Sequence, residues 1–380
     1  MKTSNILQIA SYGGPYSGGF ISSLLHLEEK IAEQTGLGTV YVFSSIAEGR
    51  PWLQLFHDRG SPVLFIDKQM AIPKRYRTVT AIAREYNAAL VHSHFGAFDL
   101  DAAVAGARVG AKVVWHVHSD LEQVYKVRQR MKDLIKMRLI ARTSVDAIIT
   151  VSSGIAQTTK LRGAPVNKII GVRNGIDTNR FQRVNRSLRA TSRQRCNITD
   201  EQLVFLLFGW DPRIKGVDLL CQAMSAINQR NNLPALCIIV SGDKNQDVIS
   251  EMIGKLPWIR VIHPVENVAE LYAIADCFVS ASRTEAFSFA IGEAMASGLP
   301  VVSSNLAHLV SIFGPAGEGF LTFRNGHAED LAMALGRILD MPSDHRRRLG
   351  EANRRFIDAN LTINHWTEKM MHLYRSILNE

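Results

Sequence analysis

Short, mostly apolar runs alternate with longer amphipathic stretches along most of the chain. Such a run, bounded by glycine or polar residues, is typical of a strand buried on both faces, whereas apolar residues spaced three or four apart indicate a helix. In the first half the expected strands are Ile6–Ala10, Val40–Phe43, Val63–Ile66, Leu90–His94, Lys112–His116 and Ala147–Val151. In the second half they are Leu203–Gly209, Ala235–Ser241, Ile259–His263, Cys277–Ser280, Pro300–Ser304 and Gly319–Leu321. The alternation predicts α/β domains with parallel sheets.

Polar residues separate the two halves of the chain. A turn signal, Arg-Asn-Gly-Ile-Asp, is followed by polar positions, and we expect the hinge within Asn174–Cys196. The sequence therefore predicts one doubly wound domain over residues 1–180 and a second over residues 196–358. Because ligands of open α/β sheets bind beyond the carboxyl ends of the strands, we expect the ligand site in the cleft between the two domains.

Composition and charge narrow the class of partner. Hydrophobic residues make up 46% of the 380 residues, a globular composition, and the formal net charge is +9. A basic chain favours an anionic partner such as a sugar nucleotide, a phosphorylated acceptor or an anionic lipid surface, and without a nucleic-acid-binding motif we expect no nucleic acid partner. The apolar runs are too short to span a bilayer, and the first is too short for a secretory signal, so we expect a cytoplasmic location.

The stretch SRTEAFSFAIGEAMASGLPVVSSN carries the most specific chemistry. Glu285 and Glu293 lie eight positions apart in it. The spacing predicts a helix over Phe289–Ala296 that ends at Gly298. The start of a helix presents free N–H groups and a positive dipole end to an anion, and Glu293, about two turns along, can face the same side as Glu285. One acid beside a reacting sugar and one beside a ribose is a plausible use of this pair.

The order of residues in this stretch resembles that of the family-four retaining glycosyltransferases, which carry a Glu-x7-Glu signature. The resemblance implies the GT-B fold, two doubly wound Rossmann-like domains facing across a cleft, with a final helix at about 360–380 that returns to the first domain. It also implies that Glu285 lies by the transferred sugar and Glu293 at the ribose hydroxyls. Backbone N–H groups for the sugar and diphosphate would come from Ala286, Phe287, Ser288 and Phe289.

Two motifs in the first half fit the same resemblance. A glycine-rich loop follows the first strand, and the resemblance places its backbone, with Gly13 and Gly14, near the donor diphosphate. It places His118 beside the donor sugar, where an imidazole can hydrogen bond to a hydroxyl or to phosphate. The alternating His92, His94, His116 and His118 could suggest a zinc cage, but no acidic or cysteine ligand accompanies them. We therefore expect no metal site and no cofactor.

Two further motifs lie in the second half. Lys215 precedes a predicted helix, where a cation can neutralise a departing diphosphate. In the family an arginine often stands upstream of this lysine; here Trp210 occupies its place, and Arg213 is the candidate for the second cation. The resemblance places Val265 along the nucleobase, contacted mostly through its backbone.

Together these motifs and the resemblance imply retaining, metal-independent transfer of a sugar from a nucleotide diphosphate sugar to an acceptor hydroxyl. UDP-hexose or UDP-N-acetylhexosamine is the expected donor and GDP-mannose the alternative. The expected acceptor is a small molecule or a lipid-linked glycan, in the synthesis of cell-surface glycans, glycoconjugates or natural products. Two other functions stay open: a sugar-nucleotide epimerase on the same fold, and a non-catalytic two-domain sugar-binding protein.

A basic amphipathic stretch over residues 126–142 has two interpretations. It could rest on an anionic membrane as a peripheral contact on the inner face, presenting a lipid-linked acceptor. It could equally be a solvated helix with one core-facing stripe.

Overall fold

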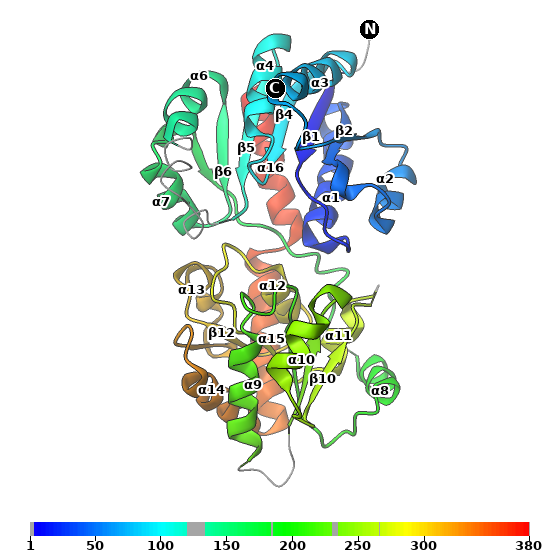
Figure 1. Ribbon diagram of the computed structural model, residues 1–380, viewed down its shortest axis with the longest axis vertical. Helices are drawn as coiled ribbons and strands as arrows, with labels where there is room; N and C mark the ends of the chain where they lie inside the picture. Colours follow the sequence, from blue (N-terminus) through cyan, green and yellow to red (C-terminus); the bar gives the residue numbers. More distant parts are fainter. Residues whose placement is uncertain (1–3, 120–133, 184, 230–234, 266, 380) are drawn as a thin grey trace. The chain divides into compact units, whose positions relative to one another are not determined.

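The computed structural model describes residues 4–119, 134–183, 185–229, 235–265 and 267–379 (Figure 1). The chain forms two compact units, Met1–Gly175 together with Ile363–Glu380, and Ile176–Thr362. Each is built around its own parallel sheet. The predicted class, two doubly wound α/β sheets, is confirmed.

In the described residues of the first unit, seven strands form one sheet in the order β3-β2-β1-β4-β5-β6-β7. Their bounds are β1 Asn5–Ala10, β2 Gly38–Ser44, β3 Val63–Ile66, β4 Ala88–His94, β5 Lys112–Val117, β6 Ala147–Thr150 and β7 Ile169–Gly171. Six of the seven overlap a predicted run. The edge strand β7 does not, because three residues are too few to form a recognisable apolar pattern.

Helices cover both faces of this sheet (Figure 1). They are α1 Gly18–Thr35, α2 Gln54–His57, α3 Ile72–Glu85, α4 Asp99–Val109, α6 Ala141–Ser144, α7 Ser153–Leu161 and α16 Ile363–Leu378, with shorter turns η1 Ser45–Ala47, η2 Pro51–Leu53, η3 Lys136–Ile140 (a π-helix) and η4 Val166–Lys168. The last helix, α16, comes after the second unit in sequence but packs against α1. Its Trp366, Met370 and Tyr374 are buried in one cluster with Ile6 and Leu27. The core of the first unit is therefore completed by the end of the described chain.

The second unit holds six strands in its described residues, in the order β10-β9-β8-β11-β12-β13. Their bounds are β8 Val204–Phe208, β9 Leu236–Val240, β10 Ile259–Ile262, β11 Cys277–Ser280, β12 Val301–Ser304 and β13 Phe320–Phe323. The helices are α8 Arg186–Arg195, α9 Val217–Asn228, α10 Gln246–Ile253, α11 Ala269–Ile274, α12 Phe289–Ala296, α13 Ala307–Phe313, α14 Ala328–Asp340 and α15 Ser343–Asn360, with 3-10 turns η5 Asp243–Asn245 and η6 Gly314–Gly319. A cluster of buried hydrophobic residues, most of them from the strands, α9 and α14, forms the core.

The strand order locates the ligand-binding edge of each sheet. In the first unit the order reverses between β1 and β4, and in the second between β8 and β11. In open α/β sheets the loops that leave neighbouring strands at such a reversal diverge to opposite faces, and ligands bind beyond the carboxyl ends there. The residues that follow β1, β4, β8 and β11 are therefore the first places to look for chemistry.

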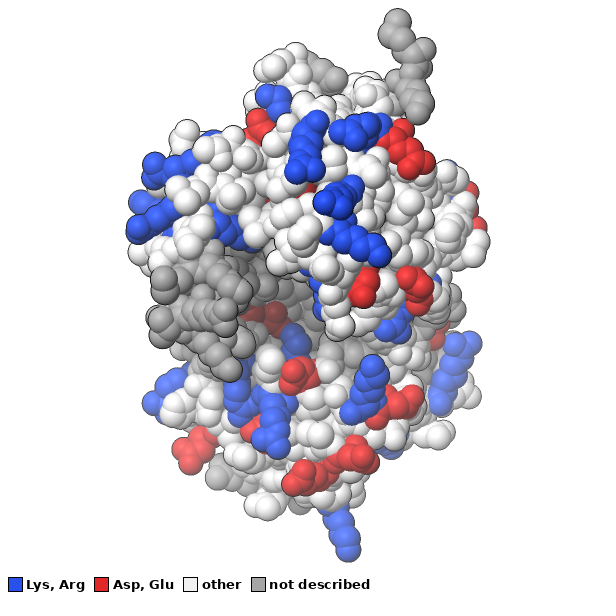
Figure 2. Space-filling model, turned by 45° about the horizontal axis from the view of Figure 1, so that its top comes forward, with Lys and Arg blue, Asp and Glu red and all other residues white. Residues whose placement is uncertain are grey.

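The surface carries charges of both signs. On the face shown in Figure 2, lysine and arginine side chains are interspersed with aspartate and glutamate over the described parts of both units. On this face, the described basic side chains are therefore not gathered into one field. None of the described helices is both long enough and apolar enough to cross a membrane.

Candidate active site

The strand reversal in the second unit brings together two of the predicted residues. Lys215 lies in the loop between β8 and α9, and Glu285 lies in the loop between β11 and α12. The Lys215 ammonium group forms an ion pair with Glu285 Oε1, and the Ser282 hydroxyl donates to the same oxygen at 3.2 Å. Both side chains stay partly accessible, 26% for Lys215 and 14% for Glu285. An ammonium and a carboxylate therefore meet at the edge where a ligand is expected.

A glycine allows the two loops to come this close. Gly216 has a φ of +69°, and a Cβ at this position would lie 2.2 Å from the carbonyl oxygen of Ala281. The left-handed conformation and the contact with the end of β11 both exclude a side chain here. Gly216 therefore fixes Lys215 beside the loop that carries Glu285.

An arginine inside the signature stretch ties the same loops together. The Arg283 guanidinium donates to both carboxylate oxygens of Asp218, at 2.9 and 2.7 Å, and to the carbonyl of Arg213. The Arg283 amide donates to the carbonyl of Ile214 at 2.8 Å. Burial alone would raise the pKa of Asp218, but the hydrogen bonds and charge of Arg283 hold it below its usual value. Sequence reasoning missed this pair; its only signal was a basic residue two positions before Glu285.

The N-terminus of α12 is capped by its own sequence. Ser288, where the resembled family usually has glycine, is the N-cap residue, and its Oγ accepts from the Ile291 amide at 3.4 Å. The first N–H groups of a helix have no acceptor within the helix and are available to an anion. Ala286 and Phe287 are buried just before this end, and the ring of Phe287 lies 5.3 Å from that of Phe289. The segment before α12 is thus held by packing, with its backbone N–H groups at the start of the helix.

Glu293 lies on α12 and is buried, with 8% of its surface exposed. The Tyr272 hydroxyl, from α11, donates to its Oε2 at 2.9 Å. Burial raises the pKa of Glu293 to about 7, although the hydrogen bond from Tyr272 acts in the opposite direction. Such a carboxyl group changes protonation near neutral pH, and hydrogen-bond donors on a ligand would stabilise its ionised form.

Two predicted residues stand apart from this cluster. Arg213 contributes its carbonyl to Arg283, while its side chain points to solvent. Val265 follows β10, the edge strand, which β9 separates from β8. Two strand spacings, about 10 Å, separate β10 from β8.

In the first unit, the glycine-rich loop after β1 packs against aromatic and aliphatic side chains. A Cβ on Gly13 would lie 2.2 Å from Ile46, and one on Gly14 would lie 2.8 Å from the Tyr12 hydroxyl. The Trp52 indole donates to the carbonyl of Gly14 at 2.9 Å. A Cβ at either glycine would therefore force the Ile46 or Tyr12 side chain to move, whatever ligand approaches the loop.

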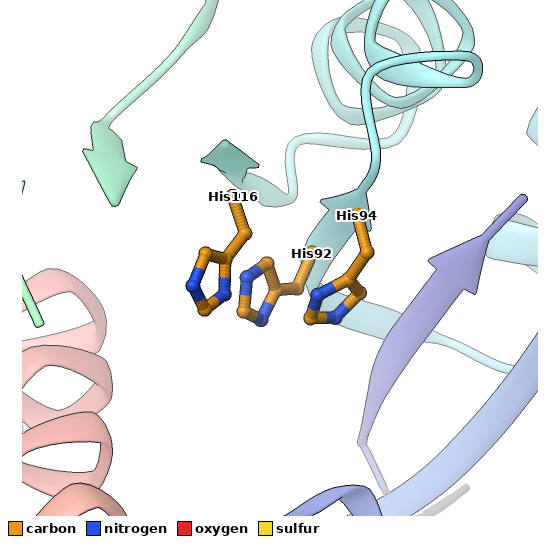
Figure 3. Close-up of side chains that lie close together, drawn as sticks. All are labelled: His92, His94 and His116. Carbon is orange, nitrogen blue, oxygen red and sulfur yellow. The ribbon is translucent and has the colours of Figure 1, made fainter. Parts of the chain in front are cut away.

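Four histidines form a staggered array, two on β4, one on the neighbouring strand β5 and one directly after β5. His94 pairs with His116 in the parallel register, His92 lies two positions before His94, and His118 lies two positions after His116. Residues two apart point to the same face of a sheet, so all four rings share one face. Figure 3 shows the rings of His92, His94 and His116 side by side. Burial lowers the pKa of each of these three well below its usual range.

His118 follows β5 and is enclosed by rings. It stacks on Phe95 at 4.4 Å between centroids and meets the edge of Phe20 at 5.5 Å. Phe95 has a φ of +64°, a left-handed conformation that is unusual for an aromatic residue and marks local strain, which clusters at functional sites. His118 is partly exposed, yet burial of its ring lowers its pKa to about 3. Its imidazole is therefore neutral at physiological pH.

Three residues of the histidine array could be metal ligands, although the sequence predicts no metal site. In the described part of the chain, ligand atoms of His92, His94 and His116 lie within 4.8 Å of one another, and neutral imidazoles are zinc ligands. Both nitrogens of His94 are already hydrogen bonded, and His92 and His116 stack in parallel, 3° apart in plane. These rings could hold a metal ion only after turning toward a common point. The absence of a metal site stays a prediction.

Two family models match this chain. The model described as "Glycosyltransferase Family 4" matches residues 26–180, and that described as "Glycosyl transferases group 1" matches residues 189–356. The first match lies in the first unit apart from its last few residues, and the second lies in the second unit.

Relatives and solved structures agree with these matches. The chain is 28% identical over 234 residues to the MMP alpha-(1->4)-mannosyltransferase of Mycolicibacterium hassiacum, covering 60% of this chain and 53% of that protein, so it spans about half of that relative's length. It is 24% identical over 282 residues to spore coat protein SA of Bacillus subtilis, covering 70% and 72%.

Similar folds are found in a glycosyltransferase from Rickettsia africae (TM-score 0.83, 18% identity, covering 100% of this chain and 99% of that one) and in Anabaena HepE in complex with UDP-glucose (0.81, 16%, 98% and 99%). With both units matched by sequence and the fold matched over the whole length, the chain belongs to the group 1 and family 4 glycosyltransferases and has their GT-B fold.

Proposed function

We propose that this glycosyltransferase moves a sugar from a nucleotide diphosphate sugar to an acceptor hydroxyl with retention at the anomeric carbon. One observation carries the proposal: the Lys215–Glu285 ion pair lies at the strand reversal of the second unit, in the loops that open α9 and α12. A cation, a carboxylate and the N–H groups at the start of α12 match the needs of a departing diphosphate and a sugar rich in hydroxyls.

The second unit supplies the groups for the leaving diphosphate. Lys215 has three N–H donors, so it can keep Glu285 and still donate to a phosphate oxygen. The N–H groups of the segment from Ala286 to Phe289 would bind the sugar and the diphosphate. Arg213, on the same loop as Lys215, would add a second cation when its exposed side chain turns from solvent toward the diphosphate. These groups stabilise negative charge that grows as the diphosphate departs, and they therefore lower the barrier.

The reaction then balances without further reagents. The bond between the anomeric carbon and the phosphate oxygen breaks, the acceptor oxygen bonds to that carbon on the same face, and the acceptor proton passes to the departing phosphate. Glu285 positions Lys215 and accepts hydrogen bonds from the sugar. We propose that no metal ion takes part, because Lys215, Arg213 and the start of α12 supply the positive charge.

The remaining donor contacts follow the family resemblance. Glu293 would accept hydrogen bonds from the ribose hydroxyls, Val265 would lie along the base, and His118 would contact the sugar. Gly13 and Gly14 would border the diphosphate. The Anabaena neighbour, HepE, is seen with UDP-glucose, which supports a UDP-hexose donor; the mycobacterial relative is a mannosyltransferase, which keeps GDP-mannose as the alternative.

The acceptor side is supported by fewer observations. Of the basic stretch at 126–142, residues 126–133 lie outside the described residues. In the rest, Lys136 turns inward and forms an ion pair with Asp99 at 2.5 Å, while Ile135 and Leu139 are 56% and 61% exposed. Exposed aliphatic side chains one helical turn apart support a peripheral contact with a membrane and a lipid-linked acceptor.

The test combines binding and turnover. Thermal-shift measurements with UDP-glucose, UDP-N-acetylglucosamine and GDP-mannose, each with and without EDTA, identify the donor and the need for a metal. NMR of the product reports the anomeric configuration. Donor turnover that proceeds without an acceptor would favour an epimerase, and an inverted product or complete inhibition by EDTA would contradict the mechanism.

A further inference from the structure

A continuous chain of hydrogen bonds links Tyr374 to His118 through Gln8 and His94. Tyr374 of α16 lies with its hydroxyl 2.6 Å from His92 Nδ1, and it accepts from the Gln8 Nε2 group at 3.0 Å. The Gln8 Oε1 atom lies 2.9 Å from His94 Nε2. His94 Nδ1 in turn lies 3.0 Å from His118 Nε2. Residues from β1, β4, α16 and the loop after β5 are thus joined in one line.

This line is buried. Gln8, His92, His94 and Tyr374 are each no more than 2% exposed. Each lost partner would leave a buried polar atom unsatisfied, which destabilises the folded protein. The order of protons along the line is therefore constrained.

The proton positions follow from the chemistry of each group. The Gln8 Oε1 atom can only accept, so His94 Nε2 must carry the proton between them. A neutral imidazole holds one ring proton, so His94 Nδ1 has a lone pair and accepts from His118 Nε2. His118 Nδ1 is then left with a lone pair. It has no hydrogen-bond partner among the described residues.

Two observations support neutral rings throughout. Burial lowers the pKa of His92 and His94 well below the usual range and that of His118 to about 3. The ring neighbours of His118, Phe95 and His116, stack on its faces and do not hydrogen bond to its edge. Within the described chain, His94 is thus the group that decides where the proton of His118 sits.

We infer that Tyr374 and Gln8 are positioning residues that hold His118, through His94, as the Nε2–H tautomer with Nδ1 free to accept a hydrogen bond from a hydroxyl of the donor sugar. The inference rests on the proposed role of His118 at the donor. It changes what His118 can recognise, because an acceptor nitrogen suits a sugar hydroxyl and repels a phosphate oxygen. It also assigns a task to α16, which carries Tyr374 into the core of the first unit.

The first measurement uses the unaltered protein. In protein with 15N-labelled histidine, two-bond 15N–1H correlation spectra distinguish the two neutral tautomers and a metal-bound ring. We expect His118 and His94 as Nε2–H tautomers, with no effect of EDTA. A wild-type His118 in the Nδ1–H form, or stoichiometric zinc with metal-bound shifts at His92, His94 and His116, would overturn the inference.

Variants then test the cause. Tyr374→Phe keeps the ring but removes the hydroxyl that accepts from the Gln8 side-chain amide. The Gln8 amide can then rotate by half a turn and present its NH2 group to His94. We expect a mixture of His118 tautomers and a fall in kcat/KM for the donor of about tenfold, the loss of one hydrogen bond. Gln8→Met should do the same. The matched control is Tyr41→Phe, which removes a buried tyrosine hydroxyl that donates to the Leu24 carbonyl and is hydrogen bonded to Glu28, but to no residue of the line.

The outcomes separate this inference from the proposed function. An unchanged His118 tautomer in both Tyr374→Phe and Gln8→Met would overturn the inference, and so would an equal change in the Tyr41→Phe control. A tautomer that changes as expected in a protein without glycosyl transfer activity would uphold the hydrogen-bonded line and contradict the proposed function instead.

Discussion

The hydroxyl of Tyr272 donates a hydrogen bond to the carboxyl group of Glu293 at 2.9 Å, inside the second unit and with both side chains buried. This contact joins α11 to α12, and it leaves Glu293 Oε1 to other partners. Burial nevertheless outweighs it, so that the pKa of Glu293 is about 7 rather than the usual 4.5. A carboxyl group that changes charge near neutral pH within the signature stretch has consequences that can be measured.

Stability should depend on pH through Glu293. Because its pKa is raised on folding, the folded protein retains a proton that the unfolded chain loses, and the stabilising contribution falls as pH rises from about 4.5 to about 7. Glu293→Gln cannot ionise. We expect it to exceed the wild type in free energy of unfolding by about 1–3 kcal/mol at pH 8, and not at pH 4.5, in urea denaturation. An equal difference at both pH values would contradict the raised pKa.

Donor binding should respond to the same group in the opposite direction. If ribose hydroxyls donate to Glu293, the ionised carboxylate binds more tightly, and affinity should rise about tenfold between pH 6 and pH 8. UDP-glucose is the suitable ligand for calorimetry, because its diphosphate does not ionise in this range. Glu293→Gln should lose the pH dependence. Tyr272→Phe should move the midpoint to higher pH, since it removes a hydrogen bond that favours the carboxylate. A donor affinity that does not change with pH in the wild type would show that Glu293 does not contact the donor.

Lys215 should matter to catalysis far more than to folding. Lys215→Ala removes a charge aimed at the leaving group, and we expect kcat to fall about 100- to 1,000-fold, as for loss of one group that stabilises transition-state charge. The control is Lys255→Ala, an exposed lysine in the turn before β10, at the opposite edge of the sheet. Equal activity of the two variants, with melting temperatures close to that of the wild type, would show that Lys215 is not part of the active site.

The close contact at Gly216 gives a separate structural test. Gly216→Ala places a Cβ against the Ala281 carbonyl in a left-handed conformation, which costs at least about 1–2 kcal/mol and pushes Lys215 away from Glu285. We expect a lower melting temperature. We also expect a lower kcat when activity is measured below the unfolding transition, where the variant is still folded. Gly242→Ala, which meets nothing within 4 Å and follows the neighbouring strand β9, should leave both unchanged. Full activity of Gly216→Ala would show that this contact does not position Lys215.

Much of the fold could be predicted because its signals are local. The apolar runs at Ile6–Ala10 and Cys277–Ser280 are strands, and the helix Phe289–Ala296 has its predicted bounds, ending before Gly298. The family resemblance is confirmed by the matches to both halves of the chain. Edge strand β7 was missed since it makes one-sided contacts and has too few residues for a pattern.

The site was predicted less completely, because its contacts join distant positions. Lys215 and Glu285 were each identified, but their ion pair spans 70 positions and depends on β8 and β11 being neighbours. Arg283 and Asp218 gave almost no signal in sequence, although they lock the two loops. Tyr374 had none at all.

By itself, then, the sequence determined the alternation of strands and helices, the family and the order of the motifs, since each is written in residues close together in the chain. Only the tertiary structure decided which side chains meet, how deeply Glu293 and the four histidines are buried, and hence which of them are neutral. The physical reason is that sheet order and burial are properties of packing between segments, and both the pKa of a carboxyl group and the direction of a hydrogen-bonded line depend on what the rest of the chain places around it.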